Sequence, residues 1–144
     1  MSRGTIGPRL NRASFHNGTG DPDGTLPQRT FTSDQLTDFL PSLDYLVLTA
    51  PMDSRTDGIS GEPELRLMKS SAVLLNPSRG NLVQEQPLLR ALSEGWIAGA
   101  AIDTHWQFPM PPEHPLWDMP NVVMTTNVSG VGSTVYRTRV WSLF

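Results

Sequence analysis

The sequence has no cysteine among its 144 residues. A chain without thiols forms no disulfide, offers no thiolate nucleophile and holds no zinc ion through cysteine. It also has no apolar run of 18 residues, and its first residues lack the apolar core of a signal peptide. We therefore expect neither a membrane-spanning helix nor secretion, and we place the chain in the cytoplasm.

Charge is also scarce, with 17% charged residues and a formal net charge of -3. A nucleic-acid surface or a basic membrane anchor would need clustered positive charge, so we expect neither kind of partner. Hydrophobic residues make up 38% of the chain, and 144 residues are enough for one domain with a modest core.

The two ends of the chain differ from its middle. Residues 1–31 include FHNGTGDPDGTLPQ, which is rich in Gly, Pro, Asp and Asn and is typical of irregular structure. Residues 131–144 begin as a helix and stop at Phe144 on an apolar face, so we expect a helix that has been cut short. The folded domain should therefore occupy residues 32–130.

Apolar spacing in the middle of the chain predicts helices that alternate with buried strands. Ser33 should cap the first helix and Gly95 should end the third. The unbroken apolar run 44–51 predicts a strand buried on both faces. The helices should lie within 33–40, 60–69 and 84–95, and the strands within 44–51, 71–78, 96–103 and 121–127. This order predicts an α/β fold with a parallel sheet.

Three of these strands end in residues suited to binding. Ligands of open parallel sheets bind beyond the carboxyl ends of the strands. The first strand ends at Ala50 and Pro51, the second delivers Arg79, and the third ends at Asp103. Physical reasoning alone leaves two interpretations equally open, because Arg79 could be an ordinary surface residue and Asp103 a turn cap.

Four blocks in order resemble the D-isomer-specific 2-hydroxyacid dehydrogenases, from about Asp34 to Phe144. They are LPSLDYLVLTAPMDSRTDGISGEPELRLMK, MKSSAVLLNPSRGNLV, ALSEGWIAGAAIDT and HPLWDMPNVVMTTNVSG. The resemblance implies that residues 32–130 are the C-terminal part of a dinucleotide-binding domain. It also implies a partial Rossmann-like, doubly wound sheet that is incomplete in its N-terminal half.

The resemblance further implies a role for several residues. Arg79 matches the arginine that clamps a substrate carboxylate, for which a planar guanidinium is suited. Asp103 matches the aspartate that holds the nicotinamide carboxamide. The remaining positions that match the dinucleotide site are Ala50, Pro51, Thr56, Pro77, Ser78 and Gly130. The implied cofactor is NAD or NADP, the implied substrate is a 2-keto or 2-hydroxy acid of the glyoxylate or hydroxypyruvate kind, and the implied assembly is a homodimer.

The chain departs from the family pattern at the residues that move the proton. Asn127 stands in place of the proton-donating histidine, and Phe108 stands in place of its glutamate partner. An asparagine amide gives up no proton near neutral pH, and general acid-base catalysis contributes ~10²–10⁴-fold to a rate. Near the start, only Gly4 and Gly7 match the glycine-rich phosphate loop, so residues 1–31 are either irregular or a remnant of that loop.

These departures leave four interpretations open. The chain could be an oxidoreductase of this family with impaired catalysis. It could be a binding module that retains an anion or nucleotide site or pairs with a full-length homologue. It could also be a truncated product without a function, which predicts exposed apolar surface. In the fourth interpretation His105 is a relocated proton donor, whereas His114 is expected at the surface and His16 lies in the irregular start.

Overall fold

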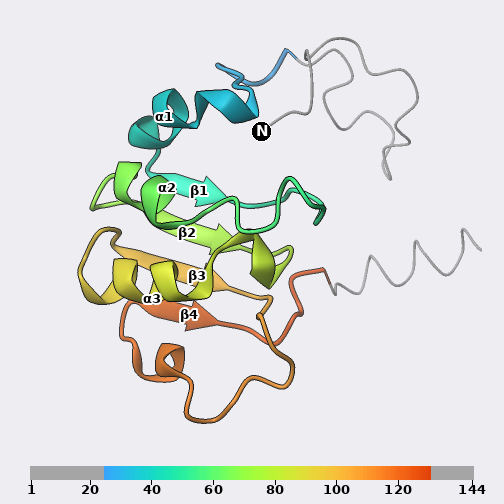
Figure 1. Cartoon of the computed structure of the whole chain (residues 1–144), viewed down its shortest axis with the longest axis vertical. Helices are drawn as coiled ribbons and strands as arrows, with labels where there is room; N and C mark the ends of the chain where they lie inside the picture. The colour runs from blue at the N-terminus through green and yellow to red at the C-terminus, as the bar shows by residue number, and fades with distance from the viewer. Residues whose placement is uncertain (1–24, 131–144) are drawn as a thin grey trace, which may run out of the picture.

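A computed structural model describes residues 25–130 of the chain (Figure 1). The expected glycine loop at Gly4 and Gly7, His16 and the expected helix in 131–144 lie outside these residues. Within the described part, four strands form one parallel sheet in the order β1-β2-β3-β4. Their bounds are Tyr45–Val47, Val73–Asn76, Gly99–Ile102 and Val122–Met124. The α/β fold and the parallel pairing are confirmed.

The helices lie where the apolar spacing predicts them, although the first is mixed. A 3-10 turn at Ser33–Gln35, helix α1 at Leu36–Phe39 and a 3-10 turn at Leu40–Ser42 make up one short helical run. Helices α2 and α3 span Glu62–Leu67 and Glu85–Ser93. Two further 3-10 turns, Gly80–Leu82 and Pro115–Asp118, are not apparent in the apolar spacing.

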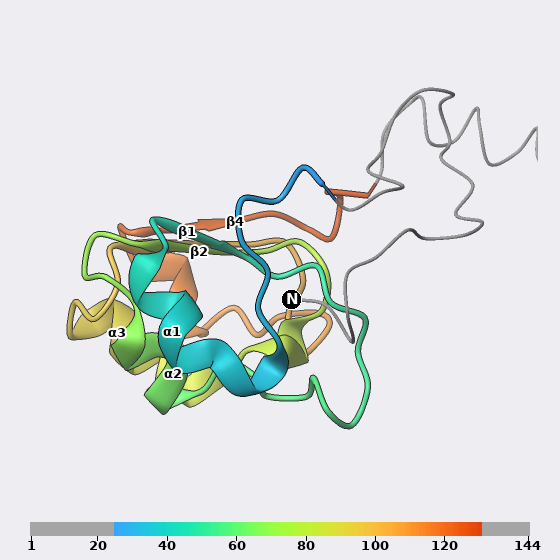
Figure 2. The same cartoon turned by 90° about the horizontal axis from the view of Figure 1, so that it is seen from above.

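The helical layer covers one face of the sheet. Figure 2 shows α1, α2 and α3 together on the same side of the four strands. The core lies between the two layers, and its largest fully buried apolar side chains come from both of them: Leu40, Leu65, Leu74, Leu82, Val83, Leu88, Ile97, Ile102 and Leu116. No described helix covers the opposite face, and no helix among residues 25–130 is long and apolar enough to cross a membrane.

This one-sided packing corrects one prediction about the first strand. In β1, Leu46 is buried, but Tyr45 is 67% exposed and Val47 is 52% exposed. The strand is therefore not buried on both faces. Its apolar run reflects one face that packs on the helices and a second face that has no described cover.

The helix ends are partly as predicted. The first helical run begins with Thr32, whose hydroxyl and backbone N–H both bond to the Gln35 side chain, so Ser33 is not the capping residue. Gly95 follows α3 with a φ of 72°, a left-handed conformation that costs glycine little. The prediction that Gly95 ends the third helix is therefore confirmed.

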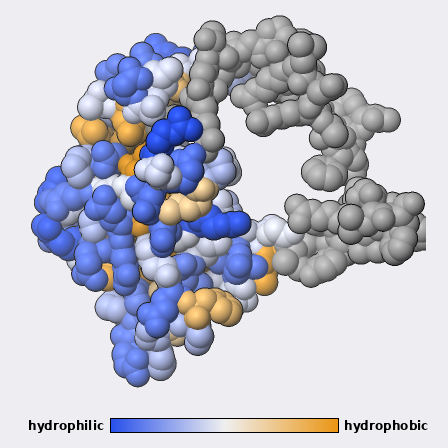
Figure 3. All heavy atoms as spheres, turned by 45° about the vertical axis from the view of Figure 1, so that its right-hand side comes forward, coloured by the Kyte–Doolittle hydropathy of each residue, from blue (hydrophilic) through white to orange (hydrophobic). Residues whose placement is uncertain are grey.

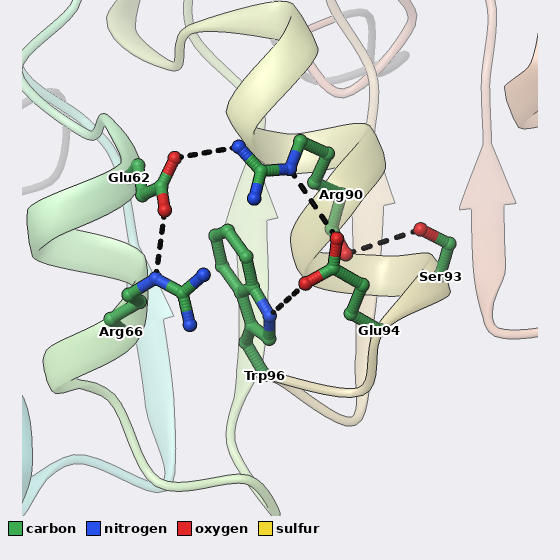
Figure 4. Close-up of polar contacts among 6 residues, drawn as sticks. All are labelled: Glu62, Arg66, Arg90, Ser93, Glu94 and Trp96. Carbon is green, nitrogen blue, oxygen red and sulfur yellow. Dashed lines mark hydrogen bonds and ion pairs between the residues drawn. The ribbon is translucent and has the colours of Figure 1, made fainter.

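Trp96 joins α2 to α3 at the outer surface of the helical layer (Figure 4). The guanidinium carbon of Arg66 lies 3.6 Å from the indole ring centroid, and that of Arg90 lies 5.2 Å from it. Glu62 accepts from Arg66 Nε at 2.8 Å and from Arg90 Nη1 at 2.9 Å. These bonds lower the pKa of Glu62, chiefly through Arg66. The indole N–H donates to Glu94 at 2.9 Å, which completes the cluster.

Candidate functional site

The carboxyl ends of β1 and β2 enclose a pocket at one edge of the sheet. The pocket has a volume of about 430 Å³ and is lined by Thr49, Ala50, Pro51, Met52, Ser78 and Arg79. Seen from the side at which the strands end, the surface is mostly hydrophilic, with small separate hydrophobic areas (Figure 3). Two neighbouring parallel strands thus bring their following loops together, as the order of the elements predicts.

A buried asparagine shapes the loop after β2. Asn76, which is fully buried, donates from Nδ2 to the carbonyl oxygen of Arg79 at 2.8 Å. Its Oδ1 accepts from the backbone N–H of Ser78 at 3.3 Å. The Ser78 hydroxyl donates to the carbonyl oxygen of Leu48 at 2.9 Å, which joins this loop to β1. These hydrogen bonds of Asn76 and Ser78 therefore hold the conformation of the loop that carries Arg79.

Arg79 is exposed at the rim of this pocket. Its Nη1 donates to the carbonyl oxygen of Ser78 at 2.7 Å, and within residues 25–130 the guanidinium pairs with no carboxylate. The remaining N–H donors of a guanidinium in this setting can bind an anion, since the fork geometry matches a carboxylate. The charge at the end of this core strand therefore lies in solvent beside the pocket.

Asp103 lies at the end of β3 and bonds to the turn that follows β4. Its Oδ1 accepts from the Thr125 hydroxyl and from the Val128 N–H at 2.9 Å, and its Oδ2 accepts from the Ser129 N–H at 2.9 Å. Burial would raise the pKa of this carboxyl, but the hydrogen bonds from Ser129, Thr125 and Val128 outweigh burial and hold the pKa well below its usual range. Asp103 therefore carries its charge in the folded protein.

Asn127 sits in the middle of the turn that Asp103 binds. Its φ of 59° lies in the left-handed region, which asparagine adopts more readily than most residues. Its backbone N–H donates to the carbonyl oxygen of Asp103 at 2.8 Å. The residue is exposed, and its side chain makes no hydrogen bond within the described part of the chain. Its amide group is therefore accessible to a ligand.

Other predicted site residues lie apart from the pocket. The Thr56 hydroxyl bonds within its own loop, to the carbonyl oxygen of Pro51 at 2.8 Å, so it fixes that loop and does not line the pocket. Pro77 accepts from the Ser129 hydroxyl at 3.2 Å. Phe108 is 79% exposed in the loop after β3. Gly130 is exposed, and a methyl group there would meet no atom within 4 Å.

The histidines divide between two environments. His105 Nε2 lies 3.0 Å from the carbonyl oxygen of Thr125, and its Nδ1 is buried without a hydrogen-bond partner among the described residues. Neither ring nitrogen lines the pocket, so the geometry does not favour a relocated proton donor. The expectation that His114 is a surface residue is wrong. Its side chain is 9% exposed, and it bonds to Glu85 at 2.8 Å and accepts from the Leu116 N–H.

Sequence reasoning missed four contributors to the site, one of which is the buried Asn76. Thr49 and Met52 line the pocket, and Ser129 links the last turn to the loop after β2. A signal existed for the buried Asn76, because a polar residue at the end of an apolar run must satisfy its own hydrogen bonds. No comparable signal marks Thr49 or Met52, since their contribution depends on the distance between two loops.

The lining of the pocket suits a small anion better than a metal cation. Its lining includes Ala50, Pro51 and the guanidinium of Arg79, which pairs with no carboxylate of residues 25–130, and the charge of Asp103 lies at the neighbouring strand end. Residues 25–130 hold no group of three or more His, Asp or Glu side chains that could share a metal ion. The predicted phosphate loop at Gly4 and Gly7 lies outside the described residues.

Comparison with known sequences finds matches to 2-hydroxyacid dehydrogenases and related reductases. The family model for the D-isomer specific 2-hydroxyacid dehydrogenase NAD binding domain matches residues 12–129. A glyoxylate reductase from Thermofilum pendens is 38% identical over 109 residues, which cover 76% of this chain and 32% of that protein. A glyoxylate/hydroxypyruvate reductase B from Yersinia enterocolitica is 43% identical over 100 residues, covering 69% of this chain and 30% of that protein.

Solved structures agree with these sequence matches. An NADPH-dependent glyoxylate/hydroxypyruvate reductase from Sinorhizobium meliloti, solved with NADP and sulfate, has a TM-score of 0.70 at 27% identity, covering 78% of this chain and 37% of that one. A D-isomer specific 2-hydroxyacid dehydrogenase from Lactobacillus delbrueckii, solved with NAD, has a TM-score of 0.67 at 32% identity, covering 74% and 36%. The chain spans about a third of the length of the relatives that it matches.

Proposed function

This chain belongs to the D-isomer specific 2-hydroxyacid dehydrogenase family, and we propose that its described part binds the nicotinamide half of NAD or NADP. The observation that carries the proposal is the pocket between the loops after β1 and β2, which is lined by Ala50, Pro51 and Ser78 and has the exposed guanidinium of Arg79 beside it to bind the acid. The relatives are named as reductases of glyoxylate or of glyoxylate and hydroxypyruvate, so we extend the proposal to a small 2-keto or 2-hydroxy acid. We also propose a cytoplasmic setting, as the sequence predicts.

The proposed roles follow the chemistry of each residue. Arg79 would bind the substrate carboxylate through paired N–H donors, and it stays charged at every physiological pH. The turn fills three of the about four acceptor positions of the Asp103 carboxylate. The remaining position would accept from the carboxamide N–H of the nicotinamide. The other proposed contacts to the dinucleotide are Ala50, Pro51, Thr56, Pro77, Ser78 and Gly130, with Gly4 and Gly7 as proposed phosphate contacts.

A bound dihydronicotinamide would supply a hydride to the carbonyl carbon, and the carbonyl oxygen must then gain a proton. Asn127, in place of the family's histidine, would donate a hydrogen bond to that oxygen but could not transfer a proton to it. Phe108, in place of the glutamate, could neither orient nor charge a proton donor. We therefore propose that these residues support slow turnover at best.

A second candidate function is binding without turnover. It is favoured by Asn127 and Phe108, since both are exposed and neither titrates near neutral pH. Such a module would bind a dinucleotide or a small carboxylate, alone, as a homodimer or paired with a full-length homologue. It differs from the first candidate in one measurable respect, which is the absence of hydride transfer when both ligands are bound.

The test is a thermal melt of the chain followed by circular dichroism. Melts would be recorded alone, with millimolar NADH or NADPH, and with oxamate added as an unreactive analogue of a 2-keto acid. A ligand at a hundred times its dissociation constant stabilises the folded state by about 2.7 kcal/mol, so binding should raise the midpoint clearly. A cooperative melt that neither dinucleotide shifts would refute the proposed function.

The control variant is Arg79→Ala. It should keep most of the shift caused by NADH and lose the further shift caused by oxamate, because only the acid is assigned to the guanidinium. Arg79→Lys should recover little of the oxamate shift, since an ammonium group lacks the planar fork. Equal oxamate shifts in all three proteins would remove Arg79 from the proposed carboxylate site.

A further inference from the structure

The buried carboxylate of Asp103 accepts hydrogen bonds from other residues of the chain. Its three hydrogen bonds all come from the segment 125–129, and two of the donors are consecutive backbone N–H groups, those of Val128 and Ser129. The backbone adds two more links, from the Thr125 N–H to the carbonyl oxygen of Ile102 at 3.0 Å and from the Asn127 N–H to that of Asp103 at 2.8 Å. The end of β3 thus holds the whole turn.

The same turn is also linked to the loop that carries Arg79. The Ser129 hydroxyl donates to the carbonyl oxygen of Pro77 at 3.2 Å, and the Asp103 N–H donates to that of Asn76 at 3.1 Å. One residue with a left-handed backbone, Asn127, lies at the centre of the turn. Few other contacts fix that conformation, because residues 125–130 are all exposed.

We infer that Asp103 is a positioning residue, which sets the conformation of the turn at 125–129. It thereby fixes the position of Asn127 relative to the loop that carries Arg79. This role differs from a direct contact with a dinucleotide, because it acts through the Asn127 amide. Its consequence for ligand binding rests on the proposed function. The fixed turn itself does not, and it can be measured in the chain without any ligand.

The first experiment compares amide hydrogen exchange, by NMR, in the unmodified chain and in Asp103→Asn. Loss of hydrogen bonds to a charged acceptor should speed exchange at Val128 and Ser129 by about 10-fold or more. Exchange in β2 should stay unchanged. The matched control is Asp53→Asn, because Asp53 also accepts backbone N–H groups in a strand-end loop, those of Arg55 and Thr56. Unchanged exchange at Val128 and Ser129 in Asp103→Asn would overturn the inference.

The second experiment measures whether Asp103 acts through Asn127. Oxamate affinity would be measured at saturating NADH for Asp103→Asn, Asn127→Ala and the double variant. If Asp103 acts through Asn127, the loss of oxamate affinity in the double variant should be smaller than the product of the two single losses by about threefold or more. The reason is that the Asp103 carboxylate has no effect on oxamate once the Asn127 amide is gone. Purely additive effects on oxamate affinity would overturn the positioning role.

The outcomes for the two proposals are separable. If Asp103→Asn weakens NADH binding and leaves oxamate affinity at saturating NADH unchanged, Asp103 acts by direct contact, which refutes positioning and retains the proposed function. If the unmodified chain binds no dinucleotide, the proposed function fails, and the exchange rates at Val128 and Ser129 still decide whether Asp103 holds the turn.

Discussion

The side-chain amide of Asn76 donates a 2.8 Å hydrogen bond to the carbonyl oxygen of Arg79, three residues later in the chain. Asn76 is fully buried, and its side-chain Oδ1 accepts from the Ser78 N–H. The loop that presents the candidate ligand-binding arginine is therefore built around one buried side chain. A change at position 76 should affect both the stability of the chain and the placement of Arg79.

We predict that Asn76→Asp lowers the free energy of unfolding by roughly 1–3 kcal/mol at pH 7. The new carboxylate oxygen would face the Arg79 carbonyl oxygen, so a buried donor is lost and two acceptors meet. Burial should raise the pKa of this carboxyl. The deficit should therefore shrink as the pH falls towards 4, because a protonated carboxyl can donate again.

Urea denaturation at several pH values would measure this difference. Asn81→Asp is the matched control, since Asn81 is exposed and its side chain makes no hydrogen bond in the described part of the chain. It should change stability by no more than about 0.5 kcal/mol. A stability of Asn76→Asp equal to that of the control at pH 7 would show that the Asn76 amide contributes little.

Gly80 leaves no space for a side chain. A methyl group at this position would lie 2.5 Å from the carbonyl carbon and oxygen of His105, which are backbone atoms and cannot rotate away. We predict that Gly80→Ala costs about 1–3 kcal/mol or more, because the loop after β2 must move away from the loop after β3. Gly130→Ala, where a methyl group meets no atom within 4 Å, should be nearly neutral. Equal denaturation midpoints for the two variants would contradict this prediction.

The sequence was enough to predict the order of the elements because each strand carries an apolar run and each helix an amphipathic one. Gly95 was a reliable stop, since the end of α3 requires a positive φ. The exposure of Tyr45 and Val47 was not predictable in the same way. An apolar run shows that a face can be buried, but the element that would cover it lies elsewhere in the chain.

The candidate site was only partly predictable. Arg79 and Ala50 could be predicted to lie close together because the carboxyl ends of parallel strands meet at one edge, whereas their roles were implied only by the family resemblance. The burial of His114 could not, because it depends on a bond to Glu85, which is 29 residues away. The turn contacts of Asp103 agree with one of the two interpretations that physical reasoning left open, that of a turn cap, although the sequence did not identify Val128 and Ser129 as the donors.

Asp103 should also give the chain a specific acid sensitivity. Its pKa is lower in the folded protein than in the unfolded chain, so its contribution to stability is present above the unfolded value, about 4, and is lost as the pH falls below it. We predict that the free energy of unfolding falls less between pH 5 and pH 2 in Asp103→Asn than in the unmodified chain. Parallel pH profiles of the two proteins, measured by urea denaturation, would contradict the assignment.

The Trp96 cluster should stabilise the contact between α2 and α3. Arg66 lies over the indole ring and also bonds to Glu62. We predict a coupling of about 0.5–1 kcal/mol between Trp96→Leu and Arg66→Ala in a double-mutant cycle, which is the range for an exposed cation–π pair. Arg55→Ala is the control, because the Arg55 side chain is 75% exposed and is not part of the cluster. A coupling as small as that of the control would mean that the stack contributes nothing.

The face of the sheet that no described helix covers should make the chain associate with itself. Tyr45, Val47 and Val123 are 67%, 52% and 65% exposed, and Val47 and Val123 belong to strands at opposite edges of the sheet. Exposed apolar surface on a sheet favours association, so Val47→Thr and Val123→Thr together should raise the concentration at which oligomers form. Threonine is also β-branched, and the free energy of unfolding should therefore change little.

Sedimentation velocity over a range of concentrations would measure this effect, with Val128→Thr as the control. Val128 is 46% exposed but lies in the turn after β4 and not in the sheet, so its replacement is compared with each single variant, Val47→Thr and Val123→Thr, before the double variant. A shift in association for the sheet variants alone would locate the contact on the face that carries Val47 and Val123. Equal shifts for both variants would mean that total apolar exposure, and not this face, controls association, and no shift in either would mean that the face does not mediate association.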